Sequence, residues 1–194
     1  MGARLTNGIA GAIIAGGAST RLGGQPKGLL EVGGARIIDR VASVLESMAS
    51  ELVIVANADD ADSWLPRARV VRDALSGGGA AAGIHAALRA TRAPTLVVAW
   101  DMPFVTADIL GTLAEHNGSD VVVCESEGGK LEPLCALYAP AFADLIEREW
   151  EHERSLHALI QRSRSVIVQG MPAWRFFNVN TPDDLVKARE MAAQ

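Results

Sequence analysis

Short apolar runs and amphipathic stretches alternate along the first two thirds of the chain. The run at residues 8–14 is apolar and is followed at once by glycines, which is typical of a buried strand that feeds a loop. Apolar residues then recur at three- and four-residue intervals over residues 37–48, as they do on an amphipathic helix. The same patterns predict further strands at residues 52–56, about 69–72 and 95–100, and further helices at about 83–90 and 106–116. Strands that alternate with helices predict a three-layer α/β fold with a mostly parallel sheet.

The pattern changes after Asp120. Two apolar runs, residues 121–124 and 134–138, are separated by the turn-rich segment 127–130. They predict a small antiparallel insertion, which would form either an edge of the sheet or a lid beside a ligand; both alternatives stay open. The remaining pattern predicts helices near residues 140–149 and 156–161, a strand near residue 166, and a last helix that Thr181 caps with Pro182 in the first helical position.

Composition narrows the class of protein. A chain of 194 residues with 49% hydrophobic and 21% charged residues is typical of a globular domain, and we expect a single domain over residues 1–194. The net charge of -5 argues against a broad surface for nucleic acid or for an anionic membrane. No apolar run approaches the roughly 18 residues of a membrane span, and no signal segment is evident, so we expect a cytoplasmic protein. Cys124 and Cys135 are expected to be buried, reduced thiols.

The loop after the first strand carries the strongest chemical signal. Gly16 and Gly17, beside small residues, allow backbone N–H groups to approach an anion closely. The segment matches neither the GxxxxGK[ST] loop nor the dinucleotide GxGxxG pattern. Arg21 and Lys27 follow, and two cations in an otherwise acidic protein are suited to neutralising a triphosphate. The alternative is a surface loop with two solvated charges.

Polar residues at the ends of later strands form a second group of candidates. Asp101 follows an apolar strand, so its carboxylate is expected at the carboxyl edge of the sheet, where open α/β folds bind ligands. One carboxylate together with substrate phosphates is sufficient for magnesium. The alternative for Asp101 is a helix or turn cap before Pro103. Asn178 and Asn180 alternate on an extended stretch, so both could face a phosphate or metal, or else cap the last helix.

The histidines do not form a metal-binding pattern. His152 and His157 are five residues apart, and this spacing turns the two imidazoles away from each other on a helix. His85 and His116 are interpreted as ordinary helix residues. No zinc site is predicted.

Taken in order, these motifs resemble the molybdenum cofactor guanylyltransferases, a MobA-like nucleotidyltransferase family with a Rossmann-like fold. The resemblance spans nearly the whole chain and rests on Ile14 to Gly23, Pro26 to Leu30, Val71 to Asp73, Gly79 to Ile84, Trp100 to Pro103, Glu132 to Leu134 and Asn178 to Pro182. It implies transfer of GMP from GTP to the terminal phosphate of molybdenum-loaded molybdopterin, which forms molybdopterin guanine dinucleotide and releases pyrophosphate. It also implies Mg²⁺ as cofactor, and molybdenum-insertion and molybdoenzyme-maturation proteins as partners.

The resemblance also implies roles for individual residues. Asp101 would hold magnesium, and Lys27 and Arg21 would bind the triphosphate as catalytic residues. The other residues implied in nucleotide binding are Ile14, Ala15, Gly16, Gly17, Asn57, Asp73 and Asn180. Glu132 and Pro133 would belong to the acceptor side, or else Glu132 is an edge-strand carboxylate. The chain has Ala80 and Ala81 where the family usually has proline and leucine, which affects the expected base selectivity.

Three alternative functions remain open at this point. The protein could use CTP, it could load another phosphorylated acceptor, or it could be a non-catalytic module that binds a nucleotide. Retention of Arg21, Lys27 and Asp101 together argues against the module.

Overall fold

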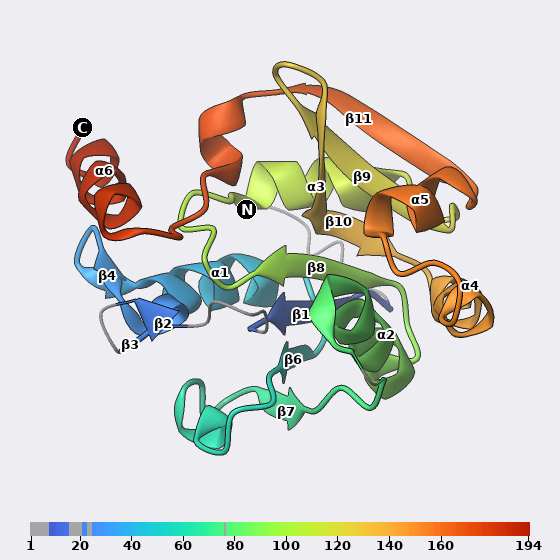
Figure 1. The fold of residues 1–194 in the computed structure, drawn as a ribbon. Coiled ribbons are helices and arrows are strands. Elements are labelled where there is room, and N and C mark those ends of the chain that lie inside the picture. Colours follow the sequence, from blue (N-terminus) through green and yellow to red (C-terminus); the bar gives the residue numbers. More distant parts are fainter. Residues whose placement is uncertain (1–7, 16–20, 23–24, 76) are drawn as a thin grey trace.

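A computed structural model describes residues 8–15, 21–22, 25–75 and 77–194. In this part of the chain, one seven-stranded sheet lies between two layers of helices (Figure 1). The strand order is β11-β9-β10-β8-β1-β6-β7. Their bounds are β1 Ala10–Ile14, β6 Leu52–Val55, β7 Arg69–Val71, β8 Thr95–Ala99, β9 Val121–Ser126, β10 Lys130–Tyr138 and β11 Ser165–Met171. All neighbouring pairs are parallel except the two made by β10, so the predicted mostly parallel sheet is confirmed.

Helices cover both faces of this sheet. The bounds are α1 Ile37–Glu46, α2 Gly79–Thr91, α3 Ala107–Glu115, α4 Ala141–Glu149, α5 Leu156–Gln161 and α6 Pro182–Ala192. One hydrophobic core joins α1 and α3 to the sheet, and a second joins α2, α4 and α5 to its other face. Consecutive residues of a strand serve opposite cores: Val97 of β8 belongs to the second and Val98 to the first. The three layers follow from strands that are apolar on both faces.

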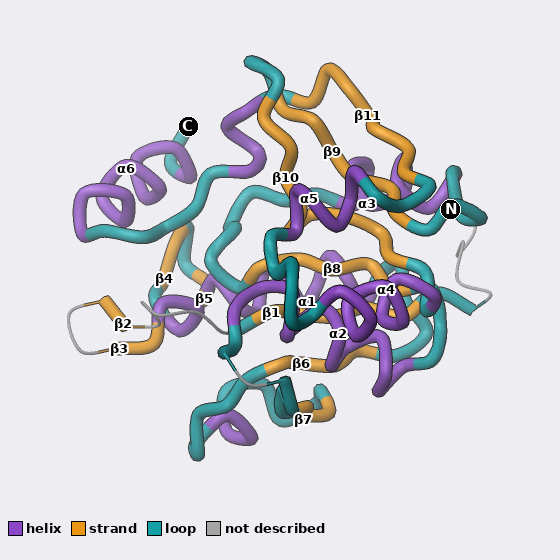
Figure 2. Tube along the Cα trace, turned by 45° about the vertical axis from the view of Figure 1, so that its right-hand side comes forward, coloured by secondary structure: helices purple, strands orange, loops and turns teal. Residues whose placement is uncertain are grey.

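Short elements lie between β1 and α1, between β6 and β7, and before α6. They are β2 Arg21–Leu22, β3 Gln25–Pro26, β4 Glu31–Val32, β5 Ala35–Arg36 and the 3-10 helices η1 Lys27–Leu29, η2 Ala61–Ser63 and η3 Ala173–Phe176. Figure 2 shows α6 beside β4 at one end of the sheet, away from α4 and α5.

The insertion at residues 121–138 forms part of the main sheet. β10 pairs with β8 on one side and with β9 on the other, and β11 pairs with β9 beyond it. The hairpin is therefore neither the edge of the sheet nor a separate lid, because β11 occupies the edge. The physical reason is that residues 121–124 are buried and apolar on both faces, which suits an interior strand better than an edge strand.

Two helix starts show how local chemistry sets the element bounds. The last helix begins as predicted, because the Thr181 hydroxyl accepts from the Asp184 N–H at 3.1 Å and the Asp184 carboxylate accepts from the Thr181 N–H at 2.8 Å. The helix predicted at about 83 begins earlier, at Gly79. That prediction was wrong because Gly78 and Gly79 end the preceding turn with positive φ angles of 60° and 87°, and the alanines after them continue the helix.

Two further expectations concern thiols and membranes. Cys124 and Cys135 are both buried free thiols, as expected. None of the helices in the described ranges is long and apolar enough to cross a membrane.

Candidate active site

Four candidate residues follow the carboxyl ends of neighbouring parallel strands. Ala15 comes directly after β1, while Asn57, Asp73 and Asp101 each lie two residues beyond the end of β6, β7 and β8. Because parallel strands end at one edge of a sheet, the fold gathers these residues on the side where such folds bind ligands.

Lys27 reaches this edge from the first loop. Its side chain is buried, with 4% of the residue exposed, and Nζ donates a hydrogen bond to the Asn180 Oδ1 at 2.6 Å. The neighbouring residue Gly28 makes this placement sterically feasible, since a Cβ there would lie 2.5 Å from Cε3 of Trp100. The turn that carries Lys27 therefore packs directly on the residue that follows β8, and only glycine fits at this contact.

Asp101 lies one residue beyond Trp100. Its partial burial raises the pKa of the carboxyl group above the usual value, and the positive charge of Lys27 acts in the opposite direction. The Asp101 carbonyl accepts from the Val179 N–H at 3.0 Å, which fastens the segment that contains Asn180 to the end of β8. The structure thus brings together three predicted site residues, Lys27, Asp101 and Asn180, from three distant parts of the sequence.

Asn178 does not share the environment of Asn180. Its side-chain amide donates to the Phe176 carbonyl at 2.9 Å, a bond within its own loop. Asn178 and Asn180 therefore have different hydrogen-bond partners, and a contact of either side chain with a phosphate or a metal stays a prediction. The amide of Asn178 satisfies the Phe176 carbonyl at the end of η3, and Val179 between the two asparagines is buried, as is expected where side chains alternate along an extended segment.

Asn57 and Asp73 meet at the ends of β6 and β7. The Asn57 Oδ1 accepts from the backbone N–H of Asp73 at 3.1 Å. This bond fixes the start of the loop that leads into α2 and leaves the Asp73 carboxylate partly exposed at the sheet edge. The roles of both residues in nucleotide binding remain predictions.

The residues of the first loop are described only in part. Ile14 and Ala15 are buried with 4% and 2% exposed, and the Ala15 N–H donates to the Val55 carbonyl at 2.9 Å, so these two residues anchor the start of the loop. Gly16 and Gly17 lie outside the described residues, and so does the side chain of Arg21. The backbone of Arg21 pairs with Pro26 across the β2–β3 ladder, which positions residue 21 next to the turn that carries Lys27.

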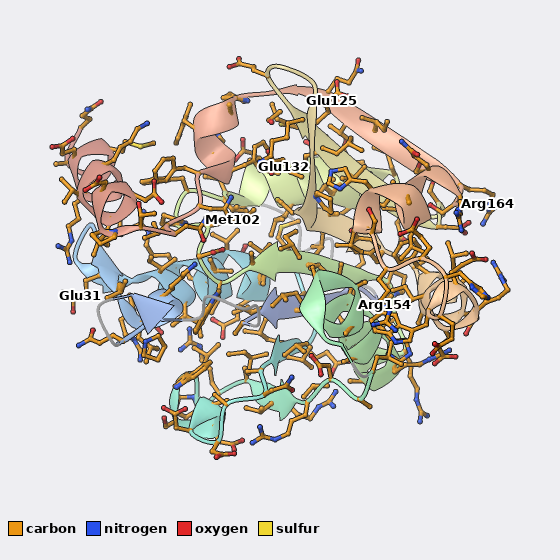
Figure 3. All side chains as sticks on the ribbon, viewed as in Figure 1. Glu31, Met102, Glu125, Glu132, Arg154 and Arg164 are labelled. Carbon is orange, nitrogen blue, oxygen red and sulfur yellow. The ribbon has the colours of Figure 1, made fainter. Side chains whose placement is uncertain are left out.

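Glu132 is a buried carboxylate. Only 4% of the residue is exposed, and its carboxylate accepts from the Ser126 hydroxyl at 3.0 Å and from the Lys130 ammonium at 3.2 Å. β10 lies between β8 and β9 at Cys135–Tyr138, whereas at Glu132 it pairs with β9 alone, so the alternatives of an acceptor-side residue and an edge-strand carboxylate both stay predictions. Figure 3 labels Glu132 on the hairpin of β9 and β10.

Sequence reasoning missed Arg154, which precedes α5. A Cβ at Gly77 would collide with the Arg154 guanidinium, so this group packs against the loop between Asp73 and α2. No sequence motif marks Arg154, because it lies in the connection between α4 and α5, which has an ordinary composition. Figure 3 shows Arg154 at α2.

The described residues contain no group of three or more His, Cys, Asp or Glu side chains that could hold a metal ion. A metal at this edge would accordingly depend on few protein ligands and on substrate oxygens, as is common for magnesium.

Comparisons with known proteins agree on one family. Residues 11–166 match the MobA-like NTP transferase domain. The probable molybdenum cofactor guanylyltransferase of Pelotomaculum thermopropionicum is 40% identical over 192 residues, which cover 94% of this chain and 92% of that protein. The molybdenum cofactor guanylyltransferase of Desulfosudis oleivorans is 34% identical, with 93% of this chain and 94% of that protein covered.

A solved structure gives the same answer. The molybdopterin-guanine dinucleotide biosynthesis protein A of Archaeoglobus fulgidus is 30% identical, superposes with a TM-score of 0.78, and is covered over 98% of its length by 95% of this chain. Three findings agree: the family match covers most of the chain, relatives of at least 30% identity cover nearly its full length, and the fold is shared. The chain therefore belongs to the family of MobA-like NTP transferase domains, and it is a nucleotidyltransferase.

Proposed function

We propose that this protein transfers GMP from GTP to the terminal phosphate of molybdenum-loaded molybdopterin, forming molybdopterin guanine dinucleotide and releasing pyrophosphate. The observation that carries the proposal is the convergence of the buried Lys27 with Asp101 and Asn180 at the carboxyl edge of the sheet. The choice of GTP and of molybdopterin rests on the relatives, which are named molybdenum cofactor guanylyltransferases.

The reaction needs alignment and charge neutralisation more than it needs a base. A phosphate monoester has its second pKa near about 6, so the acceptor phosphate is mostly dianionic at neutral pH and attacks the α-phosphorus of GTP without prior deprotonation. Two anions must then approach each other. Lys27, whose ammonium lies in a buried environment, together with Arg21, offsets this repulsion and stabilises the charge that develops on the pyrophosphate.

Magnesium is part of the proposal, and the residues present fit it. Burial raises the pKa of the Asp101 carboxyl group and so disfavours its charged form. A nearby divalent cation would stabilise the charged form. When bound, magnesium would neutralise charge on the triphosphate and on the leaving pyrophosphate. Asn180 holds the Lys27 ammonium in place through its side-chain oxygen. Asn57, Asp73 and the backbone of residues 14–17 are the proposed nucleotide contacts.

The proposal extends to the domain, compartment and partners of the protein. We propose a single nucleotidyltransferase domain over residues 1–194, because two continuous cores join the helices of the described residues to both faces of one sheet. The cytoplasm is the proposed compartment. Molybdenum-insertion and molybdoenzyme-maturation proteins are proposed as partners that deliver the acceptor and receive the product.

Release of pyrophosphate tests the proposed reaction. The purified protein is incubated with magnesium, with each nucleoside triphosphate in turn, and with or without purified molybdopterin. We expect release only with GTP and molybdopterin together. Release from CTP but not GTP would contradict the choice of nucleotide, and release with a different phosphorylated acceptor alone would contradict the choice of acceptor. Tight GTP binding without release under all conditions would identify a non-catalytic module instead.

A further inference from the structure

Two tryptophans stack on each other in the core that faces α1 and α3. Trp64 lies in the connection between β6 and β7, directly after η2, and Trp100 follows β8. Their ring centroids are 5.1 Å apart with 25° between the ring planes, and the two residues are 3% and 2% exposed. Stacked pairs at this separation are favourable beyond the burial of their area. Among the described residues the Trp64 Nε1 has no hydrogen-bond partner, so packing of the ring holds this side chain.

The pair lies at the carboxyl edge of the sheet and joins the two sides of β1. The strand order places β1 between β8, which leads to Trp100, and β6, which leads to the connection that carries Trp64. The Trp100 N–H donates to the Ile14 carbonyl at the end of β1 at 3.2 Å. Ala61 and Leu65 of the same connection as Trp64 are fully buried, which anchors that connection in the core. Figure 1 shows the connection and the end of β8 on the same side of the sheet, far from α4.

Trp100 links this pair to two charged residues of the candidate active site. Asp101 is the next residue in the chain. Gly28, the residue after Lys27, lies so close to the indole that a Cβ there would be 2.5 Å from Cε3 of Trp100. A close-packed interior relaxes towards a space that a deleted side chain vacates. Loss of the Trp64 ring would therefore let Trp100 move, and the turn that carries Lys27 would move with it.

We propose that Trp64 is a positioning residue for the transfer reaction: its ring holds Trp100, and Trp100 in turn fixes the turn that carries Lys27 relative to the end of β8. The inference rests on the proposed function, in which Lys27 binds the triphosphate. Trp64 is buried in the core and acts only through Trp100. A misplacement of about 1 Å in a reacting geometry lowers the rate by on the order of a hundredfold, whereas binding of the substrates is shared among many contacts. The role should therefore appear in kcat rather than in KM.

Two substitutions at position 64 test this role in steady-state kinetics of pyrophosphate release. Trp64→Leu removes the stacked ring and keeps an apolar side chain, and we expect kcat to fall about tenfold to a hundredfold while the KM values for GTP and molybdopterin stay within about threefold. Trp64→Phe keeps an aromatic ring and loses an N–H that bonds to none of the described residues, so its kcat should stay within about threefold of wild type.

Normal kcat in a folded Trp64→Leu, a change in KM alone, or an equal loss of kcat in Trp64→Leu and Trp64→Phe would each overturn the proposal. If Trp64→Leu does not fold, Trp64→Met is measured against the same expectations, because its flexible side chain fills more of the vacated space.

Phe142→Leu is the matched control, since it also removes one ring from a buried aromatic pair. The ring centroids of Tyr138 and Phe142 lie 4.9 Å apart, and Tyr138 pairs with Thr95 at the start of β8, at the opposite edge of the sheet from Trp100. We expect Phe142→Leu to lower the Tm as Trp64→Leu does and to leave kcat unchanged. An equal loss of kcat in Phe142→Leu would assign the effect to general destabilisation and overturn the proposal.

Amide hydrogen exchange without substrates separates this inference from the proposed function. Exchange is followed by mass spectrometry in a peptide that covers residues 27–32, where the Leu30 N–H donates to the Lys27 carbonyl at 3.1 Å. We expect faster exchange in Trp64→Leu and wild-type exchange in Trp64→Phe and Phe142→Leu. Unchanged exchange in Trp64→Leu would overturn the inference. If exchange changes as expected but wild type releases no pyrophosphate with GTP and molybdopterin, the proposed function fails while the link from Trp64 to the turn of Lys27 stands.

Discussion

Replacement of Lys27 by methionine separates the role of this residue in catalysis from its role in folding. Methionine is close to lysine in length and shape but has no charge, so it can occupy the buried position of Lys27. The variant removes one positive charge from the site and the 2.6 Å hydrogen bond to Asn180, and it leaves the surrounding packing in place.

The expected loss in turnover is large. At an effective dielectric constant of about 20, a unit charge about 4 Å from a phosphate oxygen contributes on the order of 4 kcal/mol. Removal of one such preorganised group from an enzyme typically lowers kcat by about a hundredfold to a thousandfold. We expect Lys27→Met to lose activity in this range. Since Lys27 also lowers the pKa of Asp101, the acid limb of any residual activity should move to higher pH.

The expected effect on stability is small. Loss of a hydrogen bond from a charged donor costs about 1.5–3 kcal/mol, while removal of a buried ammonium relieves a desolvation cost of similar size. The two effects oppose each other, so the Tm should stay within about 4 °C of wild type. The other partner, Asn180, is exposed and can bond to water instead.

The assay combines pyrophosphate release with thermal unfolding on the same preparations. Lys187→Met, in the exposed part of α6, is the matched control and should leave kcat and Tm near wild type. Near-normal turnover of a folded Lys27→Met would refute the assignment of Lys27 to the triphosphate. A collapse in Tm would show instead that the lysine is mainly structural.

Three further predictions address the same fold and site. Burial raises the pKa of Asp101 above the ordinary value of 3.8 for an aspartate, so protonation of this group favours the folded state, and this advantage is lost as pH rises through the folded pKa. Asp101→Asn should therefore raise the Tm at pH 7 but not at pH 3. The same variant should abolish turnover. Gly28→Ala should lower both Tm and turnover, by roughly 1–3 kcal/mol in stability, because the new methyl group would displace Trp100; unchanged unfolding curves would contradict the packing argument. The Arg89 hydrogen bonds lower the pKa of Glu147 to about 2. The difference in unfolding free energy between wild type and Glu147→Gln, at most about 1 kcal/mol for so exposed an ion pair, should therefore be present above pH 4.5 and vanish as pH falls towards 2, which thermal unfolding at each pH would measure.

Local patterns in the sequence were sufficient for most of the elements. The strands β1, β6 and β8 are buried and the helix α1 is buried on one face. Burial therefore produces apolar runs in these strands and apolar residues at three- and four-residue intervals in α1, which can be recognised in a short stretch of sequence. The cap at Thr181 is equally local, since all its hydrogen bonds lie within four residues. The start of α2 was misjudged because the alanines after Gly79 carry no amphipathic pattern.

The strand order and the composition of the site were decided by the tertiary structure. Nothing local distinguishes β10 as an interior strand between β8 and β9, because pairing depends on which apolar faces meet after the chain has folded. The same holds for Lys27 and Asn180, which lie 153 residues apart and meet through one hydrogen bond. The sequence named both as candidates through a family resemblance, but only the fold placed them together.

The sequence by itself thus determined the alternation of strands and helices, the capped last helix and the identity of the charged residues at the strand ends. The tertiary structure decided that Asn180 rather than Asn178 meets Lys27, that Glu132 is buried, and that Arg154 faces a cavity beside α2. The physical reason is one of range. Periodicity and capping act over a few residues and are legible in sequence, whereas side-chain partners are chosen by packing between segments that the sequence separates widely.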